Sequence, residues 1–206
     1  MFITFEGPDG CGKTTQARLL VRFLKERGAS VVHTFEPGAT GLGRELRRLL
    51  LEPGRHLSPV AELLLLAADR AQHVDEVIRP ALKQGAVVVC ERYVDSSIAY
   101  QGGGLGLAEE DIRRVNDVAT GGLSPDLTIL LDLDPAGSFR KGAVQDRIEG
   151  RGLEFQRRVW EAYRRLALDE PARFVSVKVE GRGVDAVQAD IRRIVMDRLA
   201  KRGMVL

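Results

Sequence analysis

The sequence predicts an α/β fold of three layers, with helices on both faces of a central parallel sheet of five strands. The first observation is that short apolar runs alternate with segments of helical periodicity, which is typical of parallel strands joined by helices. The second is the unbroken apolar run at residues 86–90, which indicates a strand buried on both faces. The third is a glycine-rich turn between the first strand and the first helix.

The expected elements follow in order along the chain. Strands are expected at residues 2–6, 30–35, 86–90, 126–132 and 173–177. Helices are expected at residues 14–27, 42–51, 58–84, 94–101 and 108–120, in a segment that contains Phe155 and Leu166, and at 184–201. The glycine run 102–104 is expected to be a flexible break between two helices. Residues 1–206 are expected to form one domain.

The composition excludes several classes of protein. Lys and Arg number 31 and Asp and Glu 29, so the net charge is +2, which argues against a general surface for nucleic acid or membranes. No apolar run approaches the ~20 residues needed to span a bilayer, and the N-terminus lacks the basic region of a signal peptide. The two cysteines form no C-x-x-C pair, so no zinc or redox motif is indicated. We therefore expect a cytoplasmic protein.

The glycine-rich turn has the spacing G-x-x-x-x-G-K-T. Its residues are Gly7, Pro8, Asp9, Gly10, Cys11, Gly12, Lys13 and Thr14, followed by Thr15. Between a strand and a helix, this spacing predicts a phosphate-binding loop, or P-loop, whose backbone N–H groups point at phosphate oxygens. Lys13 would place a positive charge on the β- and γ-phosphates, and the Thr14 hydroxyl would ligate Mg²⁺. The alternative is a turn that only joins a strand to a helix.

Charged residues are expected beside this loop, because ligands of parallel sheets bind beyond the carboxyl ends of the strands. The Glu91 carboxylate would hold Mg²⁺ and the Arg92 guanidinium would fork onto a phosphate, unless the two form a local ion pair at the surface. Glu36 and Pro37 follow the second strand. Asp9 would contact a sugar hydroxyl, a metal-bound water or a basic partner, unless it is only a turn residue.

Two further segments are candidates for substrate contacts. Ser97 and Gln101 lie four residues apart and share a helix face that suits a planar ring, the alternative being an ordinary amphipathic helix. A basic segment at about 137–150 would form a lid over the transferring phosphoryl group, the alternative being a solvated loop. Its main cations are Arg140, Lys141 and Arg147. The three histidines show no metal-ligand spacing and are interpreted as structural or surface residues.

Specific strings extend these motifs over nearly the whole chain. They are FEGPDGCGKTTQ at residues 5–16, EPG at 36–38, ADRAQHV at 68–74, RYVDSSIAYQG at 92–102 and DRIE at 146–149. Together they resemble the thymidylate kinase family, the dTMP-phosphorylating branch of the P-loop nucleoside monophosphate kinases. The resemblance implies ATP and Mg²⁺ as cofactors, dTMP as substrate, dTDP as product and a homodimer.

The resemblance also implies roles for particular residues. Asp9 would lie near the sugar of the monophosphate and the metal, and Arg92 would bind the acceptor phosphate. Arg70 would contact the thymine edge, with Ser97 and Gln101 nearby. Tyr100 would lie under the sugar and disfavour a 2′-hydroxyl. Where some members carry an arginine in the loop this chain has Gly10, so Arg140 and Arg147 of the lid would supply the catalytic cations.

Three positions depart from the family pattern. Phe35 stands where a phosphate-binding arginine is usual, Leu66 where a phenylalanine stacks on thymine, and Glu91 where an aspartate is usual. A base–aromatic stack contributes ~1–3 kcal/mol in other nucleic-acid sites. Arg44, Arg47 and Arg48 are the candidates to reach the acceptor phosphate in place of the lost arginine. Two alternatives follow, namely a kinase for another deoxynucleotide and a nucleotide-binding sensor or scaffold with weak turnover.

Overall fold

A computed structural model describes residues 1–138 and 147–204. Its centre is a parallel sheet with the strand order β2-β3-β1-β4-β5. The strands are β1 (Phe2–Glu6), β2 (Val31–Phe35), β3 (Val87–Glu91), β4 (Leu127–Asp132) and β5 (Phe174–Lys178). Each expected strand lies within one residue of its predicted bounds. All residues of β1 and β3 are buried, because helices cover both faces of these strands, and this explains the apolar run at residues 87–90 of β3.

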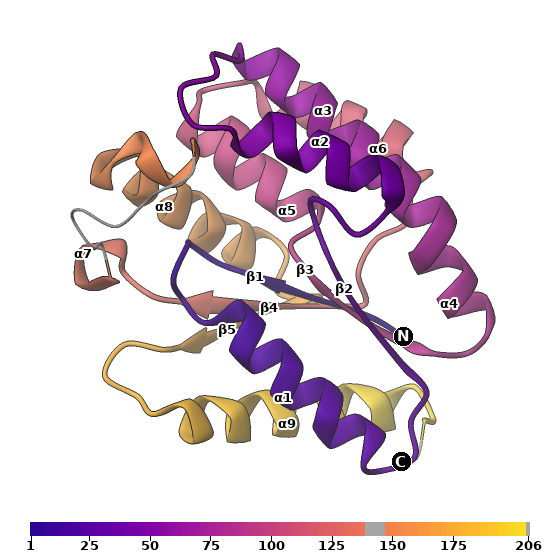
Figure 1. The fold of residues 1–206 in the computed structure, drawn as a ribbon. Coiled ribbons are helices and arrows are strands. Elements are labelled where there is room, and N and C mark those ends of the chain that lie inside the picture. Colours follow the sequence, from indigo (N-terminus) through magenta and orange to yellow (C-terminus); the bar gives the residue numbers. More distant parts are fainter. Residues whose placement is uncertain (139–146, 205–206) are drawn as a thin grey trace.

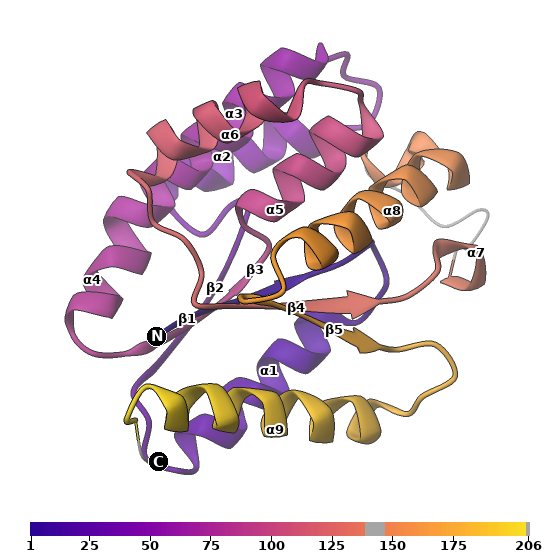
Figure 2. The same ribbon diagram turned by 180° about the vertical axis from the view of Figure 1, so that it is seen from behind.

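Helices form a layer on each face of the sheet (Figures 1 and 2). One layer contains α1 (Lys13–Lys25) and α9 (Val184–Lys201). The other contains α2 (Gly41–Leu51), α3 (Pro59–His73), α4 (Arg79–Lys83), α5 (Val94–Ser97), α6 (Glu109–Thr120) and α8 (Leu153–Asp169). The short helix α7 (Pro135–Ser138) follows β4, and a 3-10 turn (Glu149–Arg151) precedes α8. The predicted three-layer α/β fold is therefore confirmed.

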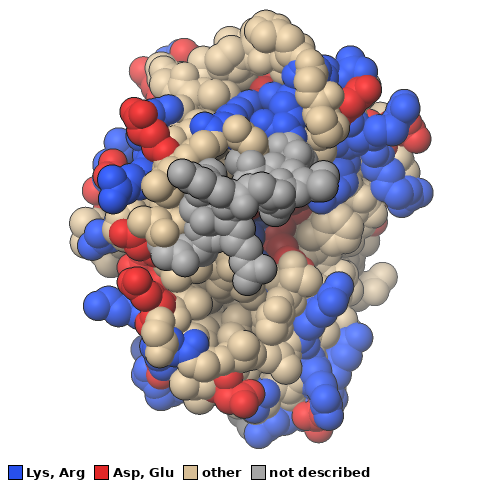
Figure 3. Space-filling view, turned by 60° about the vertical axis from the view of Figure 1, so that its left-hand side comes forward, with Lys and Arg blue, Asp and Glu red and all other residues tan. Residues whose placement is uncertain are grey.

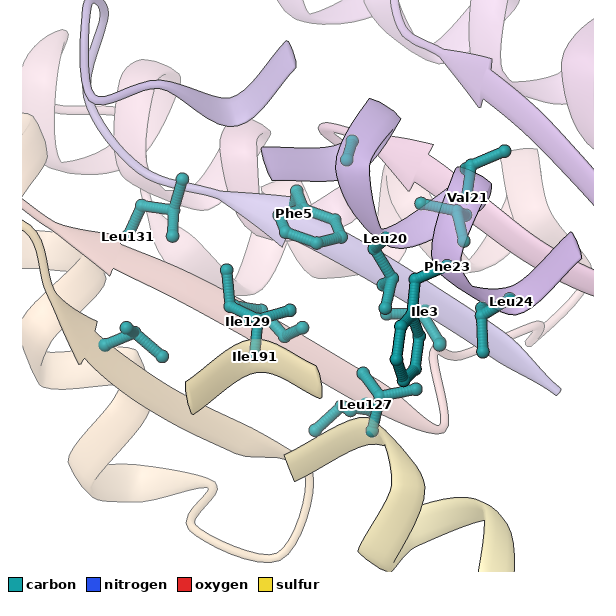
Figure 4. Close-up of a cluster of buried hydrophobic side chains, with 14 of the residues drawn as sticks. Ile3, Phe5, Leu20, Val21, Phe23, Leu24, Leu127, Ile129, Leu131 and Ile191 are labelled. Carbon is teal, nitrogen blue, oxygen red and sulfur yellow. The ribbon is translucent and has the colours of Figure 1, made fainter. Parts of the chain in front are cut away.

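The apolar core lies on both faces of the sheet. Figure 4 shows the cluster between the sheet and the layer of α1 and α9, where Ile3 and Phe5 of β1 meet Leu20 of α1 and Ile191 of α9. On the opposite face, Leu130 of β4 belongs to a cluster formed mainly by side chains of α8 and its neighbours. Both clusters hold the central strands rigidly, which fixes the positions of the residues that follow β1 and β3.

The predicted helix at 58–84 is one helical stretch, in which a π-helical segment (Val74–Ile78) connects α3 to α4. Ser58 caps α3 as expected, because its hydroxyl accepts a hydrogen bond from the Ala61 N–H. The described part of the chain contains no helix that is long and apolar enough to cross a membrane.

The expectation of a flexible break at residues 102–104 is wrong. These glycines end a π-helical segment (Ile98–Gly104), and α8 packs directly on them. A Cβ atom on Gly103 would lie 2.6 Å from Cβ of Ala162 and 3.0 Å from the carbonyl oxygen of Arg158. The glycines are therefore needed for a close approach of two helices, which a sequence pattern does not distinguish from flexibility.

Candidate active site

The predicted P-loop connects β1 to α1 at the carboxyl edge of the sheet. Gly7, Gly10 and Gly12 have φ angles of 140°, 77° and 93°, which L side chains rarely adopt. A Cβ on Gly7 would also lie 2.7 Å from the carbonyl oxygen of Leu131. Lys13 is buried, and its Nζ donates to the carbonyl oxygens of Gly7 at 2.9 Å and Pro8 at 2.7 Å. The loop thus encloses a cation beside the N-terminus of α1.

A pocket of about 670 Å³ opens in front of this loop, and we call it the donor pocket. Its lining consists of the loop residues Asp9, Gly10, Gly12, Lys13, Thr14 and Thr15, together with Arg18, His33, Phe35, Glu36, Arg47, Glu91 and Arg92. Figure 3 shows this side of the molecule, where Lys and Arg side chains border a hollow in which acidic side chains are also visible. Positive and negative groups thus meet in one depression.

Thr14 and Glu91, the two predicted metal ligands, are in contact. The Thr14 hydroxyl donates to Oε2 of Glu91 at 2.5 Å, and Nε2 of His33 lies 3.0 Å from Oε1. Burial alone would raise the pKa of Glu91, but the hydrogen bonds from His33 and Thr14 outweigh it, so the pKa is lowered and the group is ionised. The sequence indicates only a structural or surface role for His33, because its contact with Glu91 joins residues 58 positions apart.

This pair of oxygen ligands fits Mg²⁺, which keeps several waters and binds through few protein ligands together with substrate phosphates. The described residues contain no group of three or more His, Cys, Asp or Glu side chains that could hold a metal ion by themselves. A cation here would therefore depend on the bound nucleotide for its remaining ligands.

Arg92 connects the loop to the rest of the site. Its φ of 66° is rare for a non-glycine residue, and such backbone strain is concentrated at functional sites. Nη2 donates to Oδ1 of Asp9 and, at 3.1 Å, to the hydroxyl of Tyr100. Burial alone would raise the pKa of Asp9, but Arg92 and Lys13 outweigh it and lower the pKa. Asp9, Arg92 and Tyr100 thus form one bonded cluster.

The Glu6 carboxylate accepts hydrogen bonds from three groups that surround this cluster. Its Oε1 accepts from the Tyr93 N–H at 2.7 Å, and its Oε2 accepts from the hydroxyls of Ser96 at 2.6 Å and Tyr163 at 2.9 Å. The same hydroxyls face Nη1 of Arg92 at 3.2 and 3.4 Å. Burial and the nearby Asp95 raise the pKa of Glu6 to about 7. In the sequence, Glu6 is simply the residue before the P-loop. No sequence pattern indicates that its carboxylate binds the groups around Arg92.

A second pocket, of about 170 Å³, lies on the other side of Arg92, and we call it the acceptor pocket. It contains all the residues predicted to bind substrate: Glu36, Pro37, Leu66, Arg70, Arg92, Ser97, Tyr100 and Gln101. Asp9, Arg47, Leu51, Ser96 and Ile148 complete its lining. The structure thus brings together residues from the P-loop, α2, α3, the segment after β3 and the segment before α8.

Arg70 is held rigidly at the bottom of the acceptor pocket. Its Nε donates to Oε2 of Glu36, and its Nη1 donates to Ser97 and Asn116. Its Nη2 donates to the carbonyl oxygen of Tyr93. Among the described residues, these four bonds leave one of the five guanidinium N–H groups for a ligand.

Gln101 presents an acceptor to the same pocket. Its Nε2 donates to Oε1 of Glu62 at 2.8 Å, while its buried Oε1 has no partner among the described residues. An unpaired buried acceptor costs about 1–3 kcal/mol, which a ligand N–H would recover. The pocket therefore offers one acceptor and one donor to the edge of a planar ring.

The two pockets meet at Asp9, Glu36, Arg47 and Arg92, which line both of them. Of the three α2 arginines considered from the sequence, Arg47 reaches this junction, where its Nη1 donates to the carbonyl oxygen of Pro37 at 2.7 Å. Phe35, which replaces an arginine of the family pattern, lies in the donor pocket and is 42% exposed. Phe35 carries no charge, so a cation at the junction of the two pockets comes from Arg47 instead.

Of the three cations predicted for the lid, Arg147 alone lies in the described part of the chain. Arg140 and Lys141 lie outside the described residues. Arg147 donates from Nε to the carbonyl oxygen of Leu50 at 2.7 Å and forms an ion pair with Glu62. Arg147 lines neither of the two pockets, and its guanidinium pairs with the buried Glu62, which bonds Gln101.

This arrangement defines a class of protein. A P-loop pocket that shares two arginines with a second pocket, suited to a planar base, is the site of a nucleoside monophosphate kinase. The family model for thymidylate kinase matches residues 5–191. The chain therefore belongs to the thymidylate kinase family.

Individual relatives agree over nearly the full length. The chain is 51% identical to a thymidylate kinase of Synechococcus sp. (strain JA-2-3B'a(2-13)) over 199 residues, which are 97% of this chain and 96% of that protein. It is 46% identical to a thymidylate kinase of Deinococcus radiodurans over 201 residues, 96% and 97% of the two chains. The crystal structure of thymidylate kinase from Ehrlichia chaffeensis matches with a TM-score of 0.78 at 34% identity, covering 95% of this chain and 98% of that one.

Proposed function

We propose that this protein transfers the γ-phosphoryl group of ATP to dTMP and produces dTDP. The observation that carries the proposal is the junction of the two pockets, where Asp9, Arg47 and Arg92 lie between a P-loop and a site for a base. Residues 1–206 form a single kinase domain in this proposal, with a lid at about 137–150.

The donor pocket holds the phosphates of ATP. The N–H groups of Gly10 to Thr15 and the charge of Lys13 bind the β- and γ-phosphates. Thr14 and Glu91 hold Mg²⁺, which when bound neutralises charge on these phosphates. Glu91 is one methylene longer than the aspartate of the family pattern. Its contact with His33 keeps the carboxylate turned toward Thr14.

The acceptor pocket reads the base by its hydrogen-bonding edge. Thymine has a donor at N3 and an acceptor at O4, which match the free Oε1 of Gln101 and the remaining N–H of Arg70. Leu66 and Ile148 supply apolar contact with the ring faces. Cytosine reverses both groups and would leave buried polar atoms unpaired, which strongly disfavours it.

The sugar and phosphate of dTMP would lie against the Arg92 cluster. The Tyr100 hydroxyl donates to Oδ2 of Asp9 at 2.9 Å, so the ring is fixed where a 2′-hydroxyl would be disfavoured. Arg47 and Arg92 bind the acceptor phosphate and align it with the γ-phosphate. Catalysis then comes from positioning and charge neutralisation, to which Arg140 of the lid contributes.

Steady-state kinetics with ATP and dTMP, dUMP, dCMP and dGMP tests this proposal. We expect the highest kcat/KM for dTMP. Equal rates for all acceptors, or no increase over ATP alone, would contradict it. A higher value for another deoxynucleotide would favour the alternative suggested by Leu66, which lacks the ring of the usual phenylalanine. Tight binding of ATP and dTMP in calorimetry without ADP release would favour a sensor or scaffold.

We also propose a cytoplasmic homodimer, in which α2 and α3 form the contact between copies. The two helices pack together and expose the apolar side chains Leu42, Val60 and Leu64, which are 48%, 54% and 53% exposed. Val60 and Leu64 lie four residues apart and share one face of α3. Light scattering should give twice the chain mass, and Leu64→Glu should give a monomer. A monomeric wild-type protein would contradict the proposed dimer.

The proposed cytoplasmic location is tested by cell fractionation. Recovery of the native protein in a membrane fraction would contradict this location.

A further inference from the structure

The Gln101 amide is hydrogen-bonded to a charged side chain that has no solvent exposure. Glu62 of α3 is 0% exposed. Its Oε1 accepts from Nε2 of Gln101 at 2.8 Å and from Nη1 of Arg151 at 3.1 Å. Its Oε2 accepts from Nη2 of Arg151 at 2.5 Å and pairs with Nη2 of Arg147 at 2.7 Å. A buried carboxylate therefore lies directly behind the base-reading amide.

The charge of Glu62 decides what this carboxylate can do. Burial alone would raise its pKa, but the hydrogen bonds and charges of Arg151 and Arg147 outweigh the burial and lower the pKa. Glu62 is thus ionised, and an ionised carboxylate accepts hydrogen bonds without donating any.

The orientation of the Gln101 amide follows from this restriction. If the amide turned over, its oxygen would face a carboxylate oxygen, and two acceptors would be buried against each other without a proton. The amide must present Nε2 to Glu62, and its oxygen must then face the acceptor pocket. The same amide opposite a neutral donor would be free to present N–H to the pocket.

We propose that Glu62 is a specificity-determining positioning residue, which fixes the acceptor edge of Gln101 toward the pocket and thereby selects a base with an N–H group over one with a ring-nitrogen acceptor. The inference rests on the proposed function, because it assumes that a pyrimidine base occupies this pocket. Glu62 acts through Gln101 and does not itself line the pocket.

Arg151 holds the Glu62 carboxylate in place beside Gln101. Its guanidinium pairs with both carboxylate oxygens of Glu62 and lies 4.9 Å above the ring of Phe155. Phe155 in turn packs against Gly104, at the end of the segment that carries Gln101. Arg151, Glu62 and Gln101 are thus held in one packed unit, so the amide has little freedom to turn.

The test compares dTMP with dCMP in the Glu62→Gln variant. A neutral amide at position 62 can donate to Gln101 and permits the reversed orientation. The ratio of kcat/KM for dTMP to that for dCMP should fall about tenfold or more. Kd values for the two nucleotides without ATP should show the same change in calorimetry. Glu62→Asp retains the acceptor and should keep the preference, and Glu110→Gln, at an exposed glutamate of α6, is the matched control.

A double-mutant comparison isolates the route through Gln101. In a Gln101→Leu background, Glu62→Gln should leave the dTMP/dCMP ratio unchanged, because the amide that it orients is gone. An equal change in both backgrounds, or an unchanged ratio in folded Glu62→Gln protein, would overturn the inference. If wild-type protein shows no preference for dTMP, the proposed function fails first, and that result is seen before any variant is made.

A second route covers the case in which Glu62→Gln does not fold. Replacing Arg147 and Arg151 together with Gln removes both cations that keep Glu62 ionised. Burial then favours a protonated Glu62, which can donate to Gln101. The dTMP/dCMP ratio should again fall, and an unchanged ratio in this variant would overturn the inference.

Discussion

Replacing Glu6 with glutamine tests whether the position of Arg92 depends on the orientation of two hydroxyls. Ser96 and Tyr163 donate their hydrogens to Glu6, so their oxygens face Nη1 of Arg92 as acceptors. In Glu6→Gln, the amide oxygen must still accept from the Tyr93 N–H, and the amide N–H then faces the two hydroxyls. Both hydroxyls then accept from the amide, and because they lie 2.8 Å apart, one of them can donate its hydrogen to the other. At least one hydrogen must then point toward a guanidinium that can only donate.

The magnitude follows from the lengths of the two bonds. Hydrogen bonds to charged groups contribute about 1.5–3 kcal/mol. The distances of 3.2 and 3.4 Å from Nη1 are long, so we take the lower figure for the pair together. A loss of about 1.5 kcal/mol in the binding of the acceptor phosphate corresponds to about a tenfold increase in KM for dTMP.

Steady-state kinetics at saturating ATP and pH 8.5 measures this change, because the pKa of Glu6 is raised to about 7 and only the ionised carboxylate accepts from both hydroxyls. KM for ATP should stay within about twofold, because Lys13 and the loop are untouched. Tyr163→Phe removes one of the two hydroxyls and should give a smaller increase in KM for dTMP. An unchanged KM for dTMP in Glu6→Gln protein with a native circular dichroism spectrum would refute the reasoning.

Four further predictions concern single features of the site and the core. Arg47→Ala should raise KM for dTMP about tenfold to a hundredfold, whereas Arg48→Ala, which removes a cation paired with Glu45, should not; equal effects would contradict the role of Arg47. Burial and Glu36 raise the pKa of Asp69 to about 6 from a usual 3.8, so the folded protein holds this proton more tightly, and the contribution to stability is lost as pH rises through that range. Asp69→Asn should therefore raise Tm more at pH 7.5 than at pH 4, and an equal difference at both pH values would contradict this. Arg173→Leu leaves the buried Asp95 unpaired and should lower the free energy of unfolding by about 3–5 kcal/mol in urea titrations, while a loss under 1 kcal/mol would argue against the ion pair. Replacing both Arg140 and Lys141 with alanine should lower kcat more than it weakens dTMP binding, and an unchanged kcat would indicate a solvated loop.

The fold could be predicted because its signals are local and agree with one another. The apolar run before Glu91 and the P-loop spacing each depend on residues that are neighbours in the chain. The order of the strands does not follow from such patterns, and neither does the packing of Gly103 on Ala162, which depends on a helix 59 residues later. Local composition indicated flexibility at a position where close packing requires glycine.

The candidate site could be predicted in part for the same reason. Strings such as the one from Arg92 to Gln101 carry their spacing in the sequence, and the structure brings them to one pocket. The contacts of Glu62 with Gln101, 39 positions apart, and of Glu6 with Tyr163, 157 positions apart, arise only when α3 and α8 pack around the segment after β3. His33 was missed because a lone histidine on a strand is usually structural.

Transfer of label from ATP tests the central claim most directly. The protein, incubated with ATP labelled at the γ-phosphate, Mg²⁺ and dTMP, should produce labelled dTDP, and dCMP in place of dTMP should produce far less labelled diphosphate. Label that appears only as inorganic phosphate, or dTDP that forms no faster than dCDP, would contradict a site in which Arg92 joins a P-loop to a pocket for thymine.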